Sequence, residues 1–256
     1  MNDSQQLLAR QPFIKFRNVS KSFGHVQALD KVDLEVYEGE IVGLVGDNGA
    51  GKSTLVKILS GVYFADESEI RADDKLVDIK SPGDAQALGI ATVYQDLALV
   101  DHRDVASNIY LGIEPRIAGV LINRRKMWSD SKSVIESVRT TIASAKTEVG
   151  ILSGGQRQAV AIARALVRGS RLFIMDEPTA ALGVEQAEMV LSLLSDLKQR
   201  GAAVLLISHN MLHIFDVVDR VVVLRHGKKI AERNRVDTTP EEIVGLITGA
   251  IRGDAA

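Results

Sequence analysis

The sequence contains no cysteine, which excludes a disulfide framework and is compatible with a reducing compartment. Aromatic residues make up only 4% of the chain, and its formal net charge is −2 at pH 7. Nucleic-acid binding draws on positive charge for the phosphates and on aromatic platforms for the bases. We therefore expect no nucleic-acid partner.

Long apolar runs are also missing. The first residues, MNDSQQLLARQP, contain no apolar core of signal-peptide length, and AAVLLI at 202–207 is far shorter than a bilayer span. Hydrophobic residues make up 46% and charged residues 25% of 256 positions, as in folded, water-soluble proteins. We expect one large domain or a core with an inserted subdomain, and no membrane crossing by this chain.

Apolar segments of strand and helix length alternate at both ends of the chain, which predicts an α/β fold. A different, mostly polar and amphipathic region at about 96–169 predicts a mainly helical insertion. We expect a single domain over 12–250, with short tails at 1–11 and 251–256. The predicted strands are 13–16, 33–36, 41–45, 172–175, 204–207 and 221–224, and the predicted helices follow 52 and cover 184–199.

GDNGAGKST at 46–54 follows a continuous apolar strand and opens an apolar-periodic helix. This is the pattern and the context of a P-loop, in which glycines let backbone N–H groups face phosphates. The lysine adds a positive charge, and the following hydroxyl can complete a magnesium shell. The candidate nucleotide-binding residues are Gly46, Asp47, Asn48, Gly49, Ala50, Gly51, Lys52, Ser53 and Thr54.

Two carboxylates follow the apolar run LFIM, within MDEP. Functional side chains of parallel sheets gather at the carboxyl ends of strands, so Asp176 is predicted to lie beside the P-loop and to hold magnesium. Glu177 is placed to polarise the attacking water as a general base. The alternative is a charged strand end before a proline turn.

Two more polar residues follow apolar strands. His209, in SHN, could reach the γ-phosphate, and Gln95, in TVYQD, could contact the metal or the water. A single histidine or glutamine at a strand end is more often a structural or exposed residue than a catalytic one, so each interpretation depends on the rest of the site.

LSGGQ at 152–156 predicts a helix start, because Ser153 can cap a helix whose next turns carry an apolar face. A cap needs only one glycine, and this motif has two. Gly154 and Gly155 would leave backbone N–H groups accessible at the positive end of a helix, which is a second anion-binding surface.

GDNGAGKST, Gln95, LSGGQ, MDEP and His209 occur in this order over nearly the whole chain. Together they resemble the nucleotide-binding subunits of ATP-binding cassette (ABC) transporters, for which LSGGQ is the distinguishing signature. The resemblance implies a P-loop NTPase (RecA-like) core with an antiparallel β subdomain and the inserted helical subdomain, and ATP with Mg²⁺ as ligands.

The resemblance also implies that two cassettes pack head to tail, with the signature of one closing on the ATP held by the P-loop of the other. Ser153, Gly154, Gly155 and Gln156 would then meet the partner's nucleotide. Glu177 would be the catalytic base, assisted by Lys52, Gln95 and His209 as the switch, while Ser53, Gln95 and Asp176 would hold the metal. Phe23 would stack on adenine; the alternative for it is an ordinary core phenylalanine.

Longer strings at 81–112, 176–186, 207–211 and 238–250 resemble sugar importers of the ribose, xylose and fructose type. That branch implies a peripheral subunit on the cytoplasmic face of the inner membrane. Its partners would be a membrane permease, a second copy or a related cassette and, indirectly, a periplasmic or extracellular solute-binding protein. The identity of the sugar is not written in these motifs.

Four other classes stay open. A soluble ABC ATPase of ribosomes or DNA would usually show twin cassettes or a long coiled coil, and an importer of another solute would share every motif. A GTPase or kinase would leave LSGGQ unexplained, and no N-K-x-D string occurs. A regulatory module is disfavoured by Glu177 and His209. One departure from the family is Gly183, which stands where an aspartate is usual.

Overall fold

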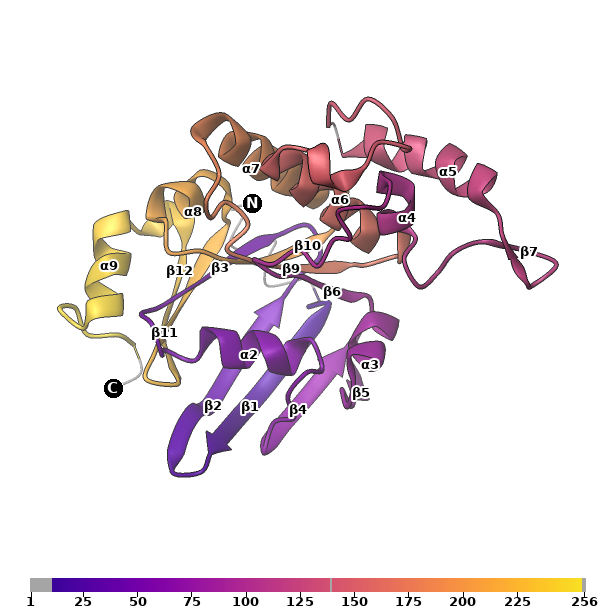
Figure 1. Cartoon of the computed structure of the whole chain (residues 1–256). Helices are drawn as coiled ribbons and strands as arrows, with labels where there is room; N and C mark the ends of the chain where they lie inside the picture. The colour runs from indigo at the N-terminus through magenta and orange to yellow at the C-terminus, as the bar shows by residue number, and fades with distance from the viewer. Residues whose placement is uncertain (1–10, 139, 255–256) are drawn as a thin grey trace.

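A computed structural model describes residues 11–138 and 140–254. Figure 1 shows a central sheet with helices on both faces, and an antiparallel sheet beneath it. The central sheet has six strands in the order β12-β11-β3-β10-β9-β6, the antiparallel sheet has four in the order β2-β1-β4-β5, and β7 and β8 form a separate hairpin. The sheet types agree with the α/β prediction.

The strands are β1 (Ile14–Phe23), β2 (Val26–Val36), β3 (Ile41–Val45), β4 (Glu67–Ala72), β5 (Lys75–Val77), β6 (Ile90–Val93), β7 (Arg116–Ile117), β8 (Leu121–Ile122), β9 (Leu172–Asp176), β10 (Ala203–Ile207), β11 (Arg220–Arg225) and β12 (Lys228–Asn234). The helices are α2 (Lys52–Leu59), α3 (Pro82–Ala87), α4 (Val105–Ile109), α5 (Arg124–Ser137), α6 (Gly154–Val167), α7 (Val184–Gln199), α8 (Met211–Val217) and α9 (Pro240–Thr248), with 3₁₀ turns η1 (Val149–Ile151) and η2 (Arg235–Asp237).

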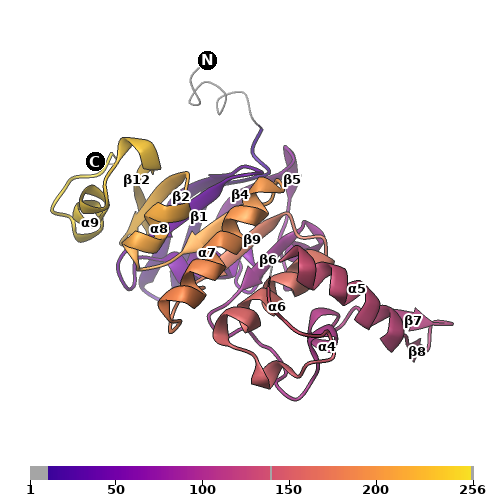
Figure 2. The same ribbon diagram turned by 90° about the horizontal axis from the view of Figure 1, so that it is seen from above.

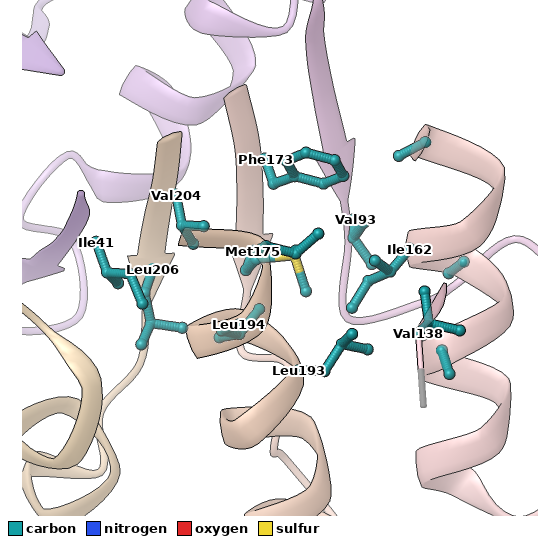
Figure 3. Close-up of a cluster of buried hydrophobic side chains, with 14 of the residues drawn as sticks. Ile41, Val93, Val138, Ile162, Phe173, Met175, Leu193, Leu194, Val204 and Leu206 are labelled. Carbon is teal, nitrogen blue, oxygen red and sulfur yellow. The ribbon is translucent and has the colours of Figure 1, made fainter. Parts of the chain in front are cut away.

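The central strands are buried on both faces, so their side chains alternate between two cores. In β9, Phe173 and Met175 join the core beneath α6, α7 and α8, whereas Leu172 and Ile174 join the core beneath α2. Figure 3 shows the first core, where β9, β10 and β6 meet α6 and α7. The helix after the P-loop and the helix that LSGGQ begins therefore cover opposite faces of the sheet.

A buried ion pair fastens the central sheet to the turn between β2 and β3. Arg220, at the start of β11, donates to both carboxylate oxygens of Glu40, at 3.1 and 2.9 Å. Their side chains are only 9% and 3% exposed. Glu40 also accepts the backbone N–H of Tyr37 at 2.7 Å, and Arg220 reaches Glu232 of β12 at 2.6 Å. This network connects the beginnings of β3 and β11, at the end of the sheet opposite the loops of the site.

The segment between β6 and β9 contains α4, α5, η1 and α6, as a mainly helical insertion would. Figure 2 shows these elements to one side of the sheet. Asp104 caps α4 and accepts the indole N–H of Trp128 on α5 at 3.0 Å, so one carboxylate joins the two helices. The sequence did not predict the β7–β8 hairpin, which projects beyond α5 in both views.

The predicted strand at 41–45 and the predicted helix at 184–199 have these same bounds in the structure. Residues 251–254, expected to be part of a tail, are docked: Asp254 pairs with Arg233 at 2.5 Å, and its N–H donates to Ile230 of β12. The rest of the tails, 1–10 and 255–256, lies outside the described residues. In the part of the chain that is described, no helix is long and apolar enough to cross a membrane.

Candidate nucleotide-binding site

Four neighbouring parallel strands end at the same edge of the sheet. β3 pairs with β10, β10 with β9, and β9 with β6, all in parallel. The residues that follow these strands are the P-loop after β3, His209 after β10, Glu177 after β9 and Gln95 after β6. Topology thus brings together four motifs that are far apart in the chain, from Gly46 of the P-loop to His209.

At two glycines of the P-loop, a side chain would collide with the neighbouring backbone. Gly46 has φ +156°, and a Cβ there would lie 2.3 Å from the carbonyl oxygen of Leu224. Gly51 has φ +106°, and its Cβ would lie 2.7 Å from the carbonyl oxygen of Ala28. The ammonium of Lys52 donates to the carbonyls of Gly46 and Asp47 at 2.7 and 3.0 Å, which holds the charge over the loop.

Two opposing charges are partly buried at this edge. Burial lowers the pKa of Lys52, although Glu177, Asp47 and Asp176 act in the other direction. Burial also raises the pKa of Asp176, as does the like charge of Glu177, while Lys52 opposes this. The lysine and the two carboxylates therefore share one electrostatic site, at the edge of the sheet where the sequence predicts them to lie.

Glu177 is held in an unusual conformation. Its φ is +52°, a region that costs free energy for a residue with a side chain. Its N–H donates to the carbonyl of Ile207 at 2.9 Å, and its Oε1 lies 2.9 Å from Nδ1 of His209. The glutamate side chain is 18% exposed and the imidazole 80%. The strained turn after β9 thus aims a shielded carboxylate at an accessible histidine.

Phe23 is not a core residue, since 44% of its surface is exposed. Its ring packs edge to face on Tyr63, with centroids 5.3 Å apart, and the Lys21 ammonium lies 5.5 Å from its centroid. An exposed aromatic face at the end of β1 leaves the ring free to stack. Sequence reasoning missed Tyr63, although an aromatic just beyond the P-loop helix was a usable signal.

Sequence reasoning also missed a pair of side chains, Thr179 and His213, which follow Glu177 and His209 in the chain. The Thr179 hydroxyl is 3.0 Å from Nδ1 of His213, which lies one helical turn beyond His209. Asn210 caps α8 by accepting the N–H groups of Leu212 and His213. These contacts fix the histidine segment relative to the turn that carries Glu177. No sequence signal distinguished Thr179 from an ordinary turn residue.

LSGGQ forms the expected helix cap. Ser153 accepts the N–H of Gln156 at 3.3 Å, and the Gln156 amide oxygen accepts the N–H of Ser153 at 3.0 Å, which is a full capping box. Gln156 also donates to the carbonyl of Thr141 at 3.4 Å. Its side chain is therefore already engaged within its own chain.

The two glycines of LSGGQ have a packing role that sequence reasoning missed. A Cβ on Gly154 would lie 2.5 Å from Leu182, and one on Gly155 would lie 2.5 Å from Met189. The start of α6 thus lies close against α7 and the segment before it. Ser153 remains exposed, whereas Gly155 is buried.

The proposed metal ligands offer hard oxygen donors, which suit Mg²⁺. Asp176 supplies a half-buried carboxylate, and the Ser53 hydroxyl and Gln95 amide are exposed at the same edge of the sheet. The part of the chain that is described contains no cluster of three or more His, Cys, Asp or Glu side chains able to hold a metal by themselves. This donor set fits an ion that takes most of its ligands from phosphate and water.

Gly183 is the cap of α7, with φ −68° and no side-chain hydrogen bond. A Cβ there would meet no atom within 4 Å, so the backbone would accept the aspartate usual in the family. The departure from the pattern is therefore a change of side chain and not of backbone.

Comparisons with known proteins agree with this geometry. The family model described as ABC transporter matches residues 29–180. The xylose/arabinose import ATP-binding protein XylG of Sulfolobus acidocaldarius is 45% identical over 94% of this chain and 95% of its own length. The fructose import ATP-binding protein FrcA of Rhizobium meliloti is 42% identical over 95% of this chain and 96% of its own.

Among solved structures, a dimeric ATP-binding cassette bound to ADP and Pi in a post-hydrolysis state has a TM-score of 0.72 to this chain. The two sequences are 26% identical, and the alignment covers 87% of this chain and 98% of the other chain. The fold, the ordered motifs and the relatives agree, and the chain therefore belongs to the ATP-binding family of ABC transporters.

Proposed function

We propose that this chain hydrolyses ATP to power the import of a sugar through a membrane permease. The observation that carries the proposal is the edge of the central sheet where the P-loop, Asp176, Glu177 and His209 meet. The family makes the chain an ATP-binding subunit with ATPase activity coupled to transport. Its similarity to two sugar-import ATP-binding proteins, over nearly their whole length, supports a sugar as the cargo.

The residues at this edge have separate roles in the proposed reaction. The P-loop N–H groups and Lys52 would hold the β- and γ-phosphates, and the exposed Phe23 ring would stack on adenine. Glu177 would accept the proton of the attacking water, with His209 orienting its carboxylate. Ser53, Asp176 and Gln95 would hold Mg²⁺, which neutralises charge on the phosphates.

A second copy would complete the site. α6 and α2 cover opposite faces of the sheet, which supports a signature that serves another chain's nucleotide. Large apolar side chains are exposed beside the signature, at the start of α7 and after His209, namely Ile151, Val184 and Leu212. These positions would be covered if the faces of two cassettes closed on ATP. The dimeric relative is consistent with such an assembly.

The permease would dock at a cavity of about 320 Å³ between α3, β6 and α6. Val62 and Tyr94 line it together with Arg164. Arg164 also donates to the carbonyls of Leu97 and Ala98, just after Gln95, at 2.8 and 2.9 Å. A short permease segment seated here would thus contact the loop that carries a proposed metal ligand, which would couple transport to hydrolysis.

In this proposal the subunit works on the cytoplasmic face of the inner membrane. A solute-binding protein on the other side would deliver the sugar to the permease and would never touch this chain.

The experiment that tests the proposal is Glu177→Gln. Loss of a general base lowers turnover by about 100-fold or more, while the amide leaves ATP binding intact. We expect the variant to run as an ATP-dependent dimer on gel filtration. Turnover at the unmutated rate would contradict the base assignment. For the partner, affinity purification from native membranes should recover a multi-span permease, and recovery of ribosomes or DNA alone would contradict the transport role.

A further inference from the structure

The β7–β8 hairpin carries an exposed apolar tip. The chain from Ile117 to Ile122 reads IAGVLI, and Val120 and Leu121 are 77% and 69% exposed. Ile117 and Ile122 are also largely exposed. Figures 1 and 2 show the hairpin as a finger that projects away from the body of the molecule, at the end opposite α9.

The hairpin has a defined turn but little of its own to stabilise it. Ala118 and Gly119 have φ of +50° and +76°, as both central residues of a type I′ turn do, and Val120 N–H donates to the carbonyl of Ile117. Only two residue pairs form the ladder, Arg116 with Ile122 and Ile117 with Leu121. Two such short strands are marginal in water, so contact with another surface would stabilise the hairpin.

Basic residues flank the tip of the finger in the chain. Residues 113–126 contain Arg116, Arg124, Arg125 and Lys126 against one carboxylate, Glu114. Glu114 accepts the N–H of Gly112, and Lys126 pairs with Asp130 at 2.8 Å. Arg116, Arg124 and Arg125 are exposed, and none has a carboxylate within salt-bridge distance in the described ranges. The finger therefore combines an apolar tip with three exposed arginines that lie in or next to its strands in the chain.

We propose that this finger inserts its apolar tip into the interface of an anionic lipid membrane. A lipid interface has no fixed shape to match, so it accepts a convex apolar tip, whereas a protein partner would need a complementary groove. Anionic headgroups attract exposed cations, and arginines bind phosphate with two N–H groups. This contact goes beyond docking on a permease and needs no permease to form.

The test uses the whole chain and vesicles without permease. We expect it to sediment with vesicles containing phosphatidylglycerol, to release as salt rises, and to bind phosphatidylcholine vesicles much less. Leu121→Asp, which puts a charge on the tip, and Arg124→Glu with Arg125→Glu should each weaken binding by roughly tenfold or more. Val236→Asp is the matched control, because Val236 is 83% exposed in η2 and should leave binding unchanged.

Thermal melting and ATP binding would verify that each variant folds. The proposal is overturned if the intact chain ignores anionic vesicles, or if Leu121→Asp binds them as well as the control does. It is also overturned if the hairpin variants keep vesicle binding and lose only recovery with the permease, since the finger would then be a protein contact. Glu177→Gln should bind vesicles normally, so failure of the ATPase assignment would be seen separately.

Discussion

Glu177 and Asp176 are adjacent residues whose environments differ. Glu177 is placed by a strained turn against His209, whereas Asp176 ends the strand and is half-buried between Glu177 and the positive charge of Lys52. Two neighbouring carboxylates in a partly dry site repel each other unless a cation lies between them. In the chain without ligand, this repulsion between Asp176 and Glu177 therefore lowers the stability of the folded state. Bound Mg²⁺ and nucleotide would relieve it.

This cost predicts the effect of Asp176→Asn. Because the folded state raises the pKa of Asp176, the ionised carboxylate is less favourable in the folded chain than in the unfolded chain above that pKa. The neutral amide removes this cost, so the melting temperature should rise at neutral pH. The gain should vanish below about pH 4, where the carboxyl is protonated in both states. Mg²⁺-dependent turnover should fall by about 100-fold or more.

Differential scanning calorimetry across pH, with turnover measured in parallel, checks this prediction. A variant that melts below the unmutated chain at neutral pH would show that Asp176 is not under electrostatic strain. Glu185→Gln is a suitable control, because Glu185 is an exposed carboxylate in the first turn of α7.

Most candidate site residues were predictable because each follows an apolar strand or opens a helix. Gly46–Thr54, Asp176, Glu177 and His209 needed only the rule that parallel strands share an edge. Thr179 was not predictable, since its contact with His213 depends on how α8 packs in space. Tyr63 was missed although its place just beyond the P-loop helix was a usable signal. The packing role of Gly154 and Gly155 was also hidden, because it arises from α7, about thirty residues further along the chain.

At the scale of elements, buried strands and long amphipathic helices were the most predictable parts. The stretch 184–199 repeats apolar residues over four turns, which predicts a helix. The stretch 41–45 is short and apolar throughout, which predicts a buried strand. The β7–β8 hairpin has two-residue strands and an Ala-Gly turn, which carry almost no periodic signal. The sequence predicted only 13–16 and 33–36 of the longer strands β1 and β2, because the bulges in their pairing interrupt the alternation of buried and exposed residues.

Arg220 and Glu40 join elements that the sequence places 180 residues apart. Arg220→Met leaves the Glu40 carboxylate buried without its charge partner, which should cost about 3 to 5 kcal/mol of unfolding free energy. Adding Glu40→Leu to the same chain should recover much of this loss, because no uncompensated charge remains. Chemical denaturation of the two variants measures both changes. Equal stability of Arg220→Met and the unmutated chain would mean that the ion pair does not fasten β11 to the β2–β3 turn.

In the proposed dimer, each chain supplies halves of two different nucleotide sites. The P-loop helix lies on one face of the central sheet, and the helix that LSGGQ begins lies on the other. The signature of one copy would therefore complete the nucleotide site of another. One chain alone should bind ATP better than it hydrolyses it.

Mixing two inactive variants tests this claim most directly. Lys52→Ala disables the P-loop, and Ser153→Arg disables the signature; Ser153 is exposed, so its loss should cost only about 1 kcal/mol of capping. If the site forms between copies, a mixed dimer contains one complete site. Random pairing makes half of the dimers mixed, so turnover should reach roughly a quarter of the unmutated rate.

A chain carrying both substitutions is the control, because mixing it with either single variant creates no complete site. The account predicts turnover in the mixture of single variants well above the sum of the two measured separately. Turnover no higher than that sum would show that LSGGQ does not act on a neighbour's nucleotide.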